Sequence, residues 1–447
     1  MTTPLRKVLV VSFDFPPSRT SAVYRMVGLT RALPALGWEP TVLTIGSRGG
    51  VEEADLLKKL PEGIRIERTG YLDLMQWENR VARWFFGAGE TRNGHGKAGE
   101  NGHGRNSGRG LHRAAELLRS TLYFPDHTIG WVPYGLARAL QLRWQGQWDV
   151  VYTTSPPRAA PVIGWLLKEG WGAPWVMELM DPWYPPRGRL RGRAETRAHA
   201  QLVKKADRVV VMTEGHAREL EDKFRLSLSC LKIVRNGFFE EDFALTVAER
   251  ERLLDREHVH FCHFGTIYPG NDGLFFPALA QLLSEEPSWR SRLRVHLVGA
   301  ASAEAIQHAN ACGLEDVVQV HGFLPERTRT LQMMCESDCL LLFWGRADFS
   351  RLAVAGKTYD YLRAGPPILA VTHEGGVQEL VERARAGWAV RPDDAEAMKR
   401  ILRAVMEGRA LGNAQVPGRA EYVSQFRWDR LAGILAETFE EALEHAS

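Results

Sequence analysis

A lysine and a carboxylate lie three residues apart in the segment 353–371, which reads AVAGKTYDYLRAGPPILAV. Small residues and Gly356 lead into a helix predicted to begin near Lys357, and Gly365 suits the position just after its end. The first turn of such a helix favours phosphate, and Lys357 adds a cation. Asp360 lies one turn further on the same face, where it could accept hydrogen bonds from ribose hydroxyls. The pattern predicts a site for a diphosphate and sugar hydroxyls, with a surface Lys357–Asp360 pair as the alternative.

A second candidate is the stretch HVHFCHFGT at 258–266. Gly265 and Thr266 follow a predicted strand, where the backbone can face a diphosphate, although an ordinary tight turn is the alternative. In a strand, His258, His260 and Cys262 share one face and could hold a metal ion. No carboxylate or CxxC pair accompanies them, so we expect no metal site here.

The elements that must position these residues are α/β units. Continuous apolar runs are typical of strands buried in parallel sheets, and segments with helical spacing lie between them. Five such runs occupy the first half of the chain and five the second: 7–13, 39–45, 148–154, 173–179 and 206–213, then 258–267, 292–300, 317–324, 335–344 and 366–372. Two tandem doubly wound, Rossmann-like domains are the simplest architecture, with a ligand site expected in the cleft between them.

Length and composition agree with this expectation. A chain of 447 residues is too long for one typical core and favours two domains. A net charge of +3 gives no nucleic-acid footprint, and five scattered cysteines are typical of a reducing compartment. No signal peptide or transmembrane run is expected.

The domains are expected at 1–240 and 255–415. The region 416–447 contains a helix that we expect to pack back toward the N-terminal domain. A segment rich in Gly, Asn, His and Arg interrupts the first domain at 87–110, and its composition predicts a disordered insertion.

The segment GKTYDYLRAGPPILAV resembles the donor-binding segment of GT-B glycosyltransferases of family four, which usually reads P-G-K-x-x-E-Y-L-A-x-G-x-P-I-L-A. Further segments resemble that family in its order, and together they span nearly the whole chain: VLVVSFDFPPSRTSAVYRMVGLTRALPALGWEPTVLT, FPDHTIGW, DVVYTTSPPRAAPVIG, ELMDPWY, ADRVVVMTEG, KIVRNGF, HFGTIYPGNDG and VHGFLPERTRTLQMMCESDCLLL.

The resemblance implies a GT-B fold and retaining transfer of a sugar from a nucleotide-diphosphate sugar, UDP- or GDP-linked, without a metal or other cofactor. It places the donor in the C-terminal domain and a glycan or lipid-linked acceptor in the N-terminal domain. Synthesis of a bacterial surface polysaccharide or glycoconjugate is the expected setting. We expect a cytoplasmic protein and leave open a peripheral contact with the inner face of the cell membrane.

The resemblance also suggests roles for particular residues. Lys357 and Asp360 would serve the diphosphate and ribose. Gly265, Thr266 and Gly356 would lie along the nucleotide, and Gly322 and Phe323 would line its base unless they form a turn and a core aromatic. On the acceptor side the candidates are Arg25, Arg158, Asp181 and Trp183, although Asp181 could equally cap a turn.

Several positions depart from the family pattern. The first acid of the usual pair is replaced by Leu352, a common basic residue by Asn271, and a common arginine by Met180. These changes support a second hypothesis, a degenerate GT-B protein that binds nucleotide, glycan or a partner enzyme without catalysis. A nucleotide-sugar epimerase on the same fold is a third hypothesis, but no convincing set of acid and base residues supports it.

One further segment, LMQWENRVARWFFG at 74–87, carries aromatic and basic residues at helical spacing. It could lie on a membrane surface or pack on the N-terminal core.

Overall fold

The computed structural model describes residues 5–18, 20–46, 54–74, 124, 126–146, 148–183, 189–247, 251–301, 303–345, 347–408 and 416–446. The chain divides into two compact units. The N-terminal unit comprises Met1–Val23, Gly37–Val209 and Thr438–Ser447, and the C-terminal unit comprises Tyr24–Leu36 and Val210–Glu437. The predicted insertion at 87–110 and all but Leu74 of the segment 74–87 lie outside the described residues. The domain boundaries given above stay a prediction.

The first sheet has seven strands in the order β3-β2-β1-β4-β5-β6-β7. Its strands are β1 (Arg6–Val11), β2 (Trp38–Ile45), β3 (Arg65–Thr69), β4 (Val150–Ser155), β5 (Trp175–Leu179), β6 (Arg208–Val211) and β7 (Leu231–Ile233). The pairs β3–β2, β2–β1, β1–β4 and β4–β5 are parallel. Central β4 and β5 are buried along their whole length, as strands covered on both faces must be.

The second sheet has six parallel strands in the order β10-β9-β8-β11-β12-β13. Its strands are β8 (Val259–Phe264), β9 (Leu293–Val298), β10 (Val318–Gly322), β11 (Cys339–Trp344), β12 (Ile368–Thr372) and β13 (Gly387–Val390). The strand order reverses between β8 and β11, the point at which doubly wound sheets bind ligands beyond their carboxyl ends.

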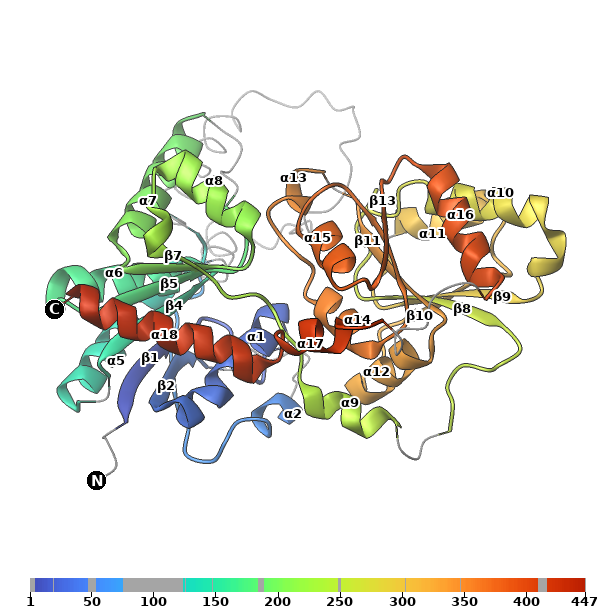
Figure 1. Cartoon of the computed structure of the whole chain (residues 1–447). Helices are drawn as coiled ribbons and strands as arrows, with labels where there is room; N and C mark the ends of the chain where they lie inside the picture. The colour runs from blue at the N-terminus through green and yellow to red at the C-terminus, as the bar shows by residue number, and fades with distance from the viewer. Residues whose placement is uncertain are drawn as a thin grey trace, which may run out of the picture. The chain divides into compact units, whose positions relative to one another are not determined.

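Helices join the strands of both sheets (Figure 1). The longer helices are α1 (Ser21–Ala32), α5 (Val132–Trp144), α6 (Ala159–Trp171), α7 (Arg189–Lys205), α8 (Glu214–Phe224), α9 (Glu240–Val247), α10 (Phe275–Glu285), α11 (Ala303–Ala311), α12 (Arg327–Glu336), α14 (Lys357–Ala364), α15 (Gly376–Arg383), α16 (Ala395–Met406) and α18 (Trp428–Ala446). The shorter ones are α2 (Ala54–Leu57), α13 (Ala347–Ser350), α17 (Arg419–Ser424), and the 3-10 turns η1 (Leu33–Leu36), η2 (Ile129–Trp131), η3 (Leu228–Cys230) and η4 (Pro287–Trp289).

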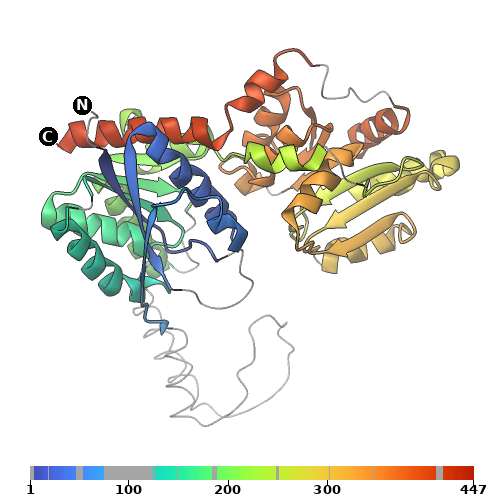
Figure 2. The same ribbon diagram turned by 90° about the horizontal axis from the view of Figure 1, so that it is seen from below.

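Helices pack on both faces of the second sheet (Figures 1 and 2), and an apolar core lies between the sheet and the helices on each face. One core joins the sheet to α10, α11 and α16, and the other joins it to α9, α12, α14 and α15. In α14, Tyr359, Tyr361 and Leu362 are buried in the second core. This packing fixes the helix against the sheet and therefore fixes Lys357 at its start.

The fold prediction of two Rossmann-like α/β domains is confirmed, but β3, β7 and β13 lie outside the ten predicted runs, and one predicted strand differs in its burial. The run 317–324 was expected to be buried on both faces, whereas the middle of β10 is exposed. The reason is its place at the edge of the sheet, where only β9 pairs with it. Within the described residues, no helix has the length and apolar character needed to cross a bilayer.

Candidate functional site

Three glycines end adjacent strands of the second sheet. Gly265, Gly299 and Gly322 lie at the carboxyl ends of β8, β9 and β10, with φ values of 95°, 118° and 64°. A Cβ atom on Gly299 would lie 2.7 Å from the carbonyl oxygen of Gly265, whereas one on Gly322 would meet open space. The strand ends therefore present bare backbone, which can approach a ligand closely.

Lys357 reaches this row of glycines from α14. A Cβ on Gly265 would lie 3.6 Å from the Lys357 Nζ atom. The same Nζ lies 2.9 Å from Nε2 of His263, the penultimate residue of strand β8. Gly265 follows that strand. Gly356 precedes the helix and is exposed, and the backbone N–H groups of Gly356 and Lys357 have no acceptor among the described residues. An amine and free N–H groups thus gather beside the glycines, as an anion requires.

The electrostatics of Lys357 follow from its surroundings. Desolvation by burial lowers the pKa of its amine to about 7. Burial, and then the charge of Lys357, hold the pKa of His263 well below its ordinary value, so this imidazole is neutral. Within the part of the chain that the structure describes, no carboxylate forms an ion pair with Lys357. An incoming anion therefore does not have to displace a carboxylate from the amine.

Asp360 has a partner that the sequence did not suggest. Arg327 of α12 donates from Nη2 to Asp360 Oδ1 at 3.0 Å and from Nε to Asp242 Oδ2 at 2.9 Å. Its guanidinium also lies over the ring of Tyr24, 4.9 Å from the centroid. Burial raises the pKa of Asp360, and Arg327 opposes that shift. The alternative of a Lys357–Asp360 surface pair is wrong, because each side chain has a different partner; the ribose role of Asp360 stays a prediction.

Exposed side chains flank the glycines. Phe323 follows β10 and is 60% exposed, and Tyr268 follows β8 and is 57% exposed. Thr266 is also exposed, next to Gly265. Aromatic side chains at such strand ends can stack on a nucleotide base. Phe323 is thus not a core aromatic, which was the alternative.

The N-terminal unit holds a second cluster, at the carboxyl ends of β4 and β5. The Arg158 guanidinium lies over the Trp183 ring at 5.4 Å, and Trp183 stacks on His199 at 5.0 Å. Arg158 Nη1 lies 3.9 Å from Oε2 of the buried Glu195. The structure brings together Arg158 and Trp183, both of which the sequence analysis singled out, and adds Glu195 and His199 from α7.

Two other acceptor-side candidates differ in setting. Asp181 follows β5 with an exposed side chain, although desolvation by the surrounding protein raises its pKa. Arg25 is buried, and its guanidinium donates to the carbonyl oxygens of Val234 and Arg235 at 2.8 and 2.6 Å. These bonds join α1 to the segment after β7, so Arg25 serves the packing of the C-terminal unit; its contact with substrate stays a prediction.

At the positions that depart from the family pattern, the side chains form no new polar contact among the described residues. Met180 is buried, and the carbonyl oxygen of Leu352 accepts a hydrogen bond from Thr213 Oγ1 at 2.7 Å. Asn271 is 4% exposed, and its Oδ1 has no hydrogen-bond partner among the described residues.

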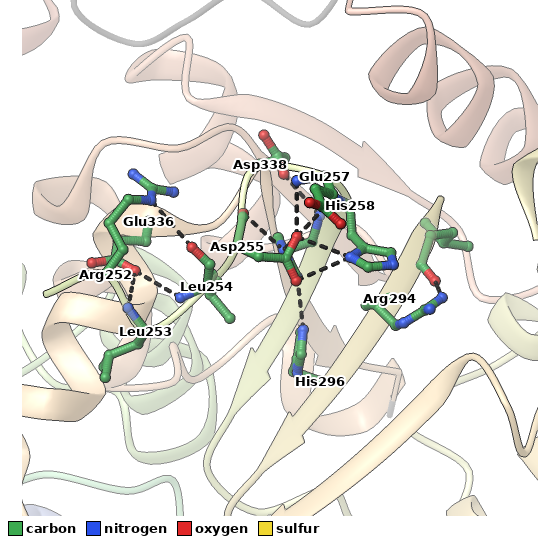
Figure 3. Close-up of polar contacts among 12 residues, drawn as sticks. Arg252, Leu253, Leu254, Asp255, Glu257, His258, Arg294, His296, Glu336 and Asp338 are labelled. Atoms are coloured by element: carbon green, nitrogen blue, oxygen red, sulfur yellow. Dashed lines mark hydrogen bonds and ion pairs between the residues drawn. The ribbon is translucent and has the colours of Figure 1, made fainter. Parts of the chain in front are cut away.

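The histidines at the start of β8 lie at the opposite end of the strand from Gly265. Asp255 accepts hydrogen bonds from the backbone N–H and the Nδ1 of His258, both at 2.9 Å (Figure 3). His260 Nδ1 lies 2.9 Å from Nε2 of His296 on β9. Burial raises the pKa of Cys262 to about 12. No group of three or more His, Cys, Asp or Glu side chains in the described part of the chain is arranged to hold a metal ion.

Known proteins resemble the chain along most of its length. A model described as "Glycosyl transferase 4-like domain" matches residues 22–237, and one described as "Glycosyl transferases group 1" matches residues 259–407. Together the two models match more than half of the chain. A D-inositol 3-phosphate glycosyltransferase of Geodermatophilus obscurus is 25% identical over 67% of this chain and 68% of its own. The enzyme of that name from Streptosporangium roseum is also 25% identical, over 69% and 73%.

Solved structures share the fold. Anabaena Alr3699/HepE in complex with UDP has a TM-score of 0.63 at 17% identity, covering 97% of this chain and 99% of its own. A glycosyltransferase from Rickettsia africae has a TM-score of 0.64 at 14% identity, covering 99% and 100%. Sucrose-phosphate synthase from Thermosynechococcus elongatus has a TM-score of 0.62 at 13% identity, covering 97% and 98%.

Proposed function

Since the chain belongs to the glycosyltransferases of the GT-B fold, we propose that it moves a sugar from a UDP- or GDP-linked donor to a glycan or lipid-linked acceptor. The reaction retains the anomeric configuration and serves the synthesis of a bacterial surface polysaccharide or glycoconjugate. The observation that carries the proposal is the Lys357 amine beside the glycine-lined ends of β8, β9 and β10.

The donor diphosphate occupies this row of strand ends. As the sugar leaves, negative charge grows on the diphosphate, and a transition state is stabilised by groups already aimed at that charge. Lys357 supplies a cation, and the free N–H groups at the start of α14 supply the positive end of a helix dipole. Asp360 and Phe323 contact the ribose and the base. The HepE structure contains UDP, which supports a nucleotide donor on this fold.

The acceptor binds at the cluster of Arg158, Asp181 and Trp183. The Trp183 Nε1 atom is buried without a hydrogen-bond partner among the described residues, so it can donate to an acceptor hydroxyl. The curated relatives are named for transfer to D-inositol 3-phosphate, a polyhydroxylated acceptor with an anionic group. Arg158 offers a cation for an acceptor of that kind, and a lipid-linked acceptor would carry a phosphate as well.

Turnover tests the proposal. The purified protein is incubated with a panel of UDP- and GDP-sugars, with and without acceptors, and release of the nucleoside diphosphate is measured. We expect release with one donor class and a loss of at least tenfold in Lys357→Met. Lys58→Met, which alters an exposed lysine directly after α2, should match the wild type. Equal turnover in Lys357→Met would remove the diphosphate role from this residue.

A non-catalytic GT-B protein is the second candidate, and Leu352 and Asn271 favour it because both replace polar family residues. Selective nucleotide binding with no turnover on any acceptor would support it. Peripheral membrane contact is tested by sedimentation with vesicles containing acidic lipid; a protein that stays in the supernatant would exclude that contact.

A further inference from the structure

His263 is held in one tautomer by the sheet around it. The ring is fully buried, stacks on Phe343 of β11 at 4.9 Å, and has Nδ1 3.0 Å from the carbonyl oxygen of Leu341. A carbonyl oxygen only accepts, so Nδ1 carries the hydrogen and Nε2 keeps its lone pair. That lone pair faces the Lys357 amine at 2.9 Å, and the amine donates to it.

This arrangement orients the amine without pairing it with an opposite charge. A carboxylate partner would hold Lys357 charged at every physiological pH and would compete with an incoming phosphate. A neutral imidazole only orients the amine, and it leaves the remaining N–H donors directed away from the ring. Among the described residues, His263 is the one side chain that forms a hydrogen bond with Lys357.

Two other polar side chains of α14 have partners of their own, whereas the Thr358 hydroxyl next to Lys357 is buried with no partner among the described residues. On α14, Asp360 pairs with Arg327, and the Tyr361 hydroxyl accepts from the backbone N–H of Phe264 at 2.8 Å. The same hydroxyl donates to the Leu341 carbonyl of β11 at 3.3 Å. Beyond β8, Gly265 and Thr266 carry no ionisable group, and the backbone hydrogen bond of Thr266, like that of Leu341, raises the pKa of His263 by less than burial lowers it. The protonation of Lys357 therefore depends on its desolvation and on whatever ligand lies beside it.

Resting on the function proposed above, we propose that His263 positions the Lys357 amine for the donor diphosphate, and that this amine takes up a proton from solvent when a nucleoside diphosphate binds. The Nζ lone pair receives the proton, and His263 stays neutral and accepts a hydrogen bond from the resulting ammonium. Since the pKa of the unliganded amine is about 7, most of it is neutral at pH 8. An adjacent diphosphate favours the charged form.

The reaction cycle gives this coupling a direction. A nucleotide-sugar carries one negative charge fewer than the nucleoside diphosphate that it leaves behind. The product therefore holds the Lys357 proton more firmly than the donor does, and the proton returns to solvent when the product dissociates.

Calorimetry measures the proton directly. UDP, GDP and ADP are titrated into the full chain at pH 8, in Tris and in sulfonate buffers that differ in ionisation enthalpy. If the amine titrates at about 7 and is fully protonated in the complex, uptake is about 0.9 proton at pH 8, where the terminal phosphate of the nucleotide is already almost fully ionised and contributes little. The uptake should be smaller for the matching nucleotide-sugar than for the nucleoside diphosphate.

Three variants separate positioning from packing. Lys357→Met should bind at least tenfold more weakly and without proton uptake. His263→Gln keeps an acceptor oxygen for the amine and should retain the nucleotide affinity, whereas His263→Phe should bind the nucleotide several-fold more weakly but still take up the proton, because burial alone keeps the amine desolvated. His216→Phe alters another buried histidine of the same unit and should leave the uptake unchanged. A carbon-13 NMR titration of the Lys357 Cε in the wild type provides a readout that needs no variant.

The outcomes are distinguishable. Nucleotide binding without proton uptake, or with equal uptake in Lys357→Met, would overturn the coupling and leave the proposed function standing. A Lys357 Cε chemical shift whose titration midpoint lies near pH 10 in the unliganded protein would also overturn the coupling. Failure of every nucleotide to bind would overturn the proposed function, and the coupling with it.

Discussion

The two candidate sites both lie at the carboxyl ends of parallel strands, but they are built differently. In the C-terminal unit, three strands end in glycines, and one amine enters from α14. In the N-terminal unit, the strand ends carry a stacked set of large side chains, in which Arg158, Trp183 and His199 lie face to face. In the proposed function, backbone and one cation recognise the diphosphate that UDP- and GDP-linked donors share. A site made of side chains can change with the acceptor. Among related enzymes we therefore expect the side chains of the N-terminal cluster to vary more than the glycine-lined strand ends.

Charge compensation sharpens the contrast. Arg158 has Glu195 beside it, whereas Lys357 has only a neutral histidine among its described contacts. An anion that binds Arg158 must compete with a carboxylate, but one that binds Lys357 does not. Changes on the two sides should therefore separate into donor effects and acceptor effects.

The largest expected effect follows from Arg327→Met. This change leaves Asp360 and Asp242 close together without their shared cation. Breaking a buried ion pair typically costs 3–5 kcal/mol. Because the Arg327 side chain is 25% exposed, we expect about 3 kcal/mol of lost stability. Urea unfolding at pH 7 measures it, and a loss recovered at pH 4, where carboxyl groups take up protons, would identify the charge as the cause.

Next in size is Gly299→Ala. A side chain at φ 118° is strained, and its Cβ would lie 2.7 Å from the Gly265 carbonyl oxygen. We expect a loss of about 2–3 kcal/mol in stability and weaker nucleotide binding, since Gly265 must move. Gly313→Ala, at φ 67° with open space around its Cβ, should cost about 1 kcal/mol and leave binding intact. Equal costs in the two variants would contradict the close packing of strand ends.

A third effect depends on pH. The folded state lowers the pKa of Lys357 to about 7, so between pH 7 and 10 the unfolded chain binds more protons. The wild type therefore gains stability relative to Lys357→Met as the pH rises, by about 2 kcal/mol between pH 7 and 9. Thermal or urea unfolding of both proteins across this range measures the difference. A difference that does not change with pH would mean that Lys357 is not desolvated.

The smallest effect concerns the acceptor. Arg158→Gln removes the cation over Trp183 and should weaken acceptor binding by about 1–2 kcal/mol. We expect a KM for the acceptor raised about tenfold, with the affinity for nucleotide unchanged. Arg138→Gln, in the same unit but paired with Glu67, is the control. A change in nucleotide affinity would show that the two sites are not separable in this way.

The two Rossmann-like domains could be predicted from the sequence because strands buried in a parallel sheet are continuous apolar runs. Such a run can be recognised without knowing which strands pair with it. The sequence also singled out Gly265, Gly322, Lys357, Arg158 and Trp183, each of which follows a predicted strand end or begins a helix, and their binding roles stay a prediction. It did not identify His263 as the partner of Lys357, although that histidine lies two residues before Gly265. The pairing depends on how α14 packs on β8 and on a tautomer set by the Leu341 carbonyl.

Arg327 was missed for a related reason. Its contacts with Asp360, Asp242 and Tyr24 join residues up to about three hundred positions apart, and no local pattern announces them. The exposure of β10 is likewise a property of sheet order, because an edge strand and a central strand can share one apolar pattern.

The central claim is that the glycine-lined strand ends and Lys357 form a diphosphate site. The most direct test is the affinity of the wild type and Lys357→Met for UDP, GDP and ADP, measured without metal at pH 7. We predict selective binding of one nucleotide, weakened 10- to 150-fold in the variant, which corresponds to about 1.5–3 kcal/mol for a charge-assisted hydrogen bond. Equal affinity in the two proteins, or no binding of any nucleotide by the wild type, would contradict the claim.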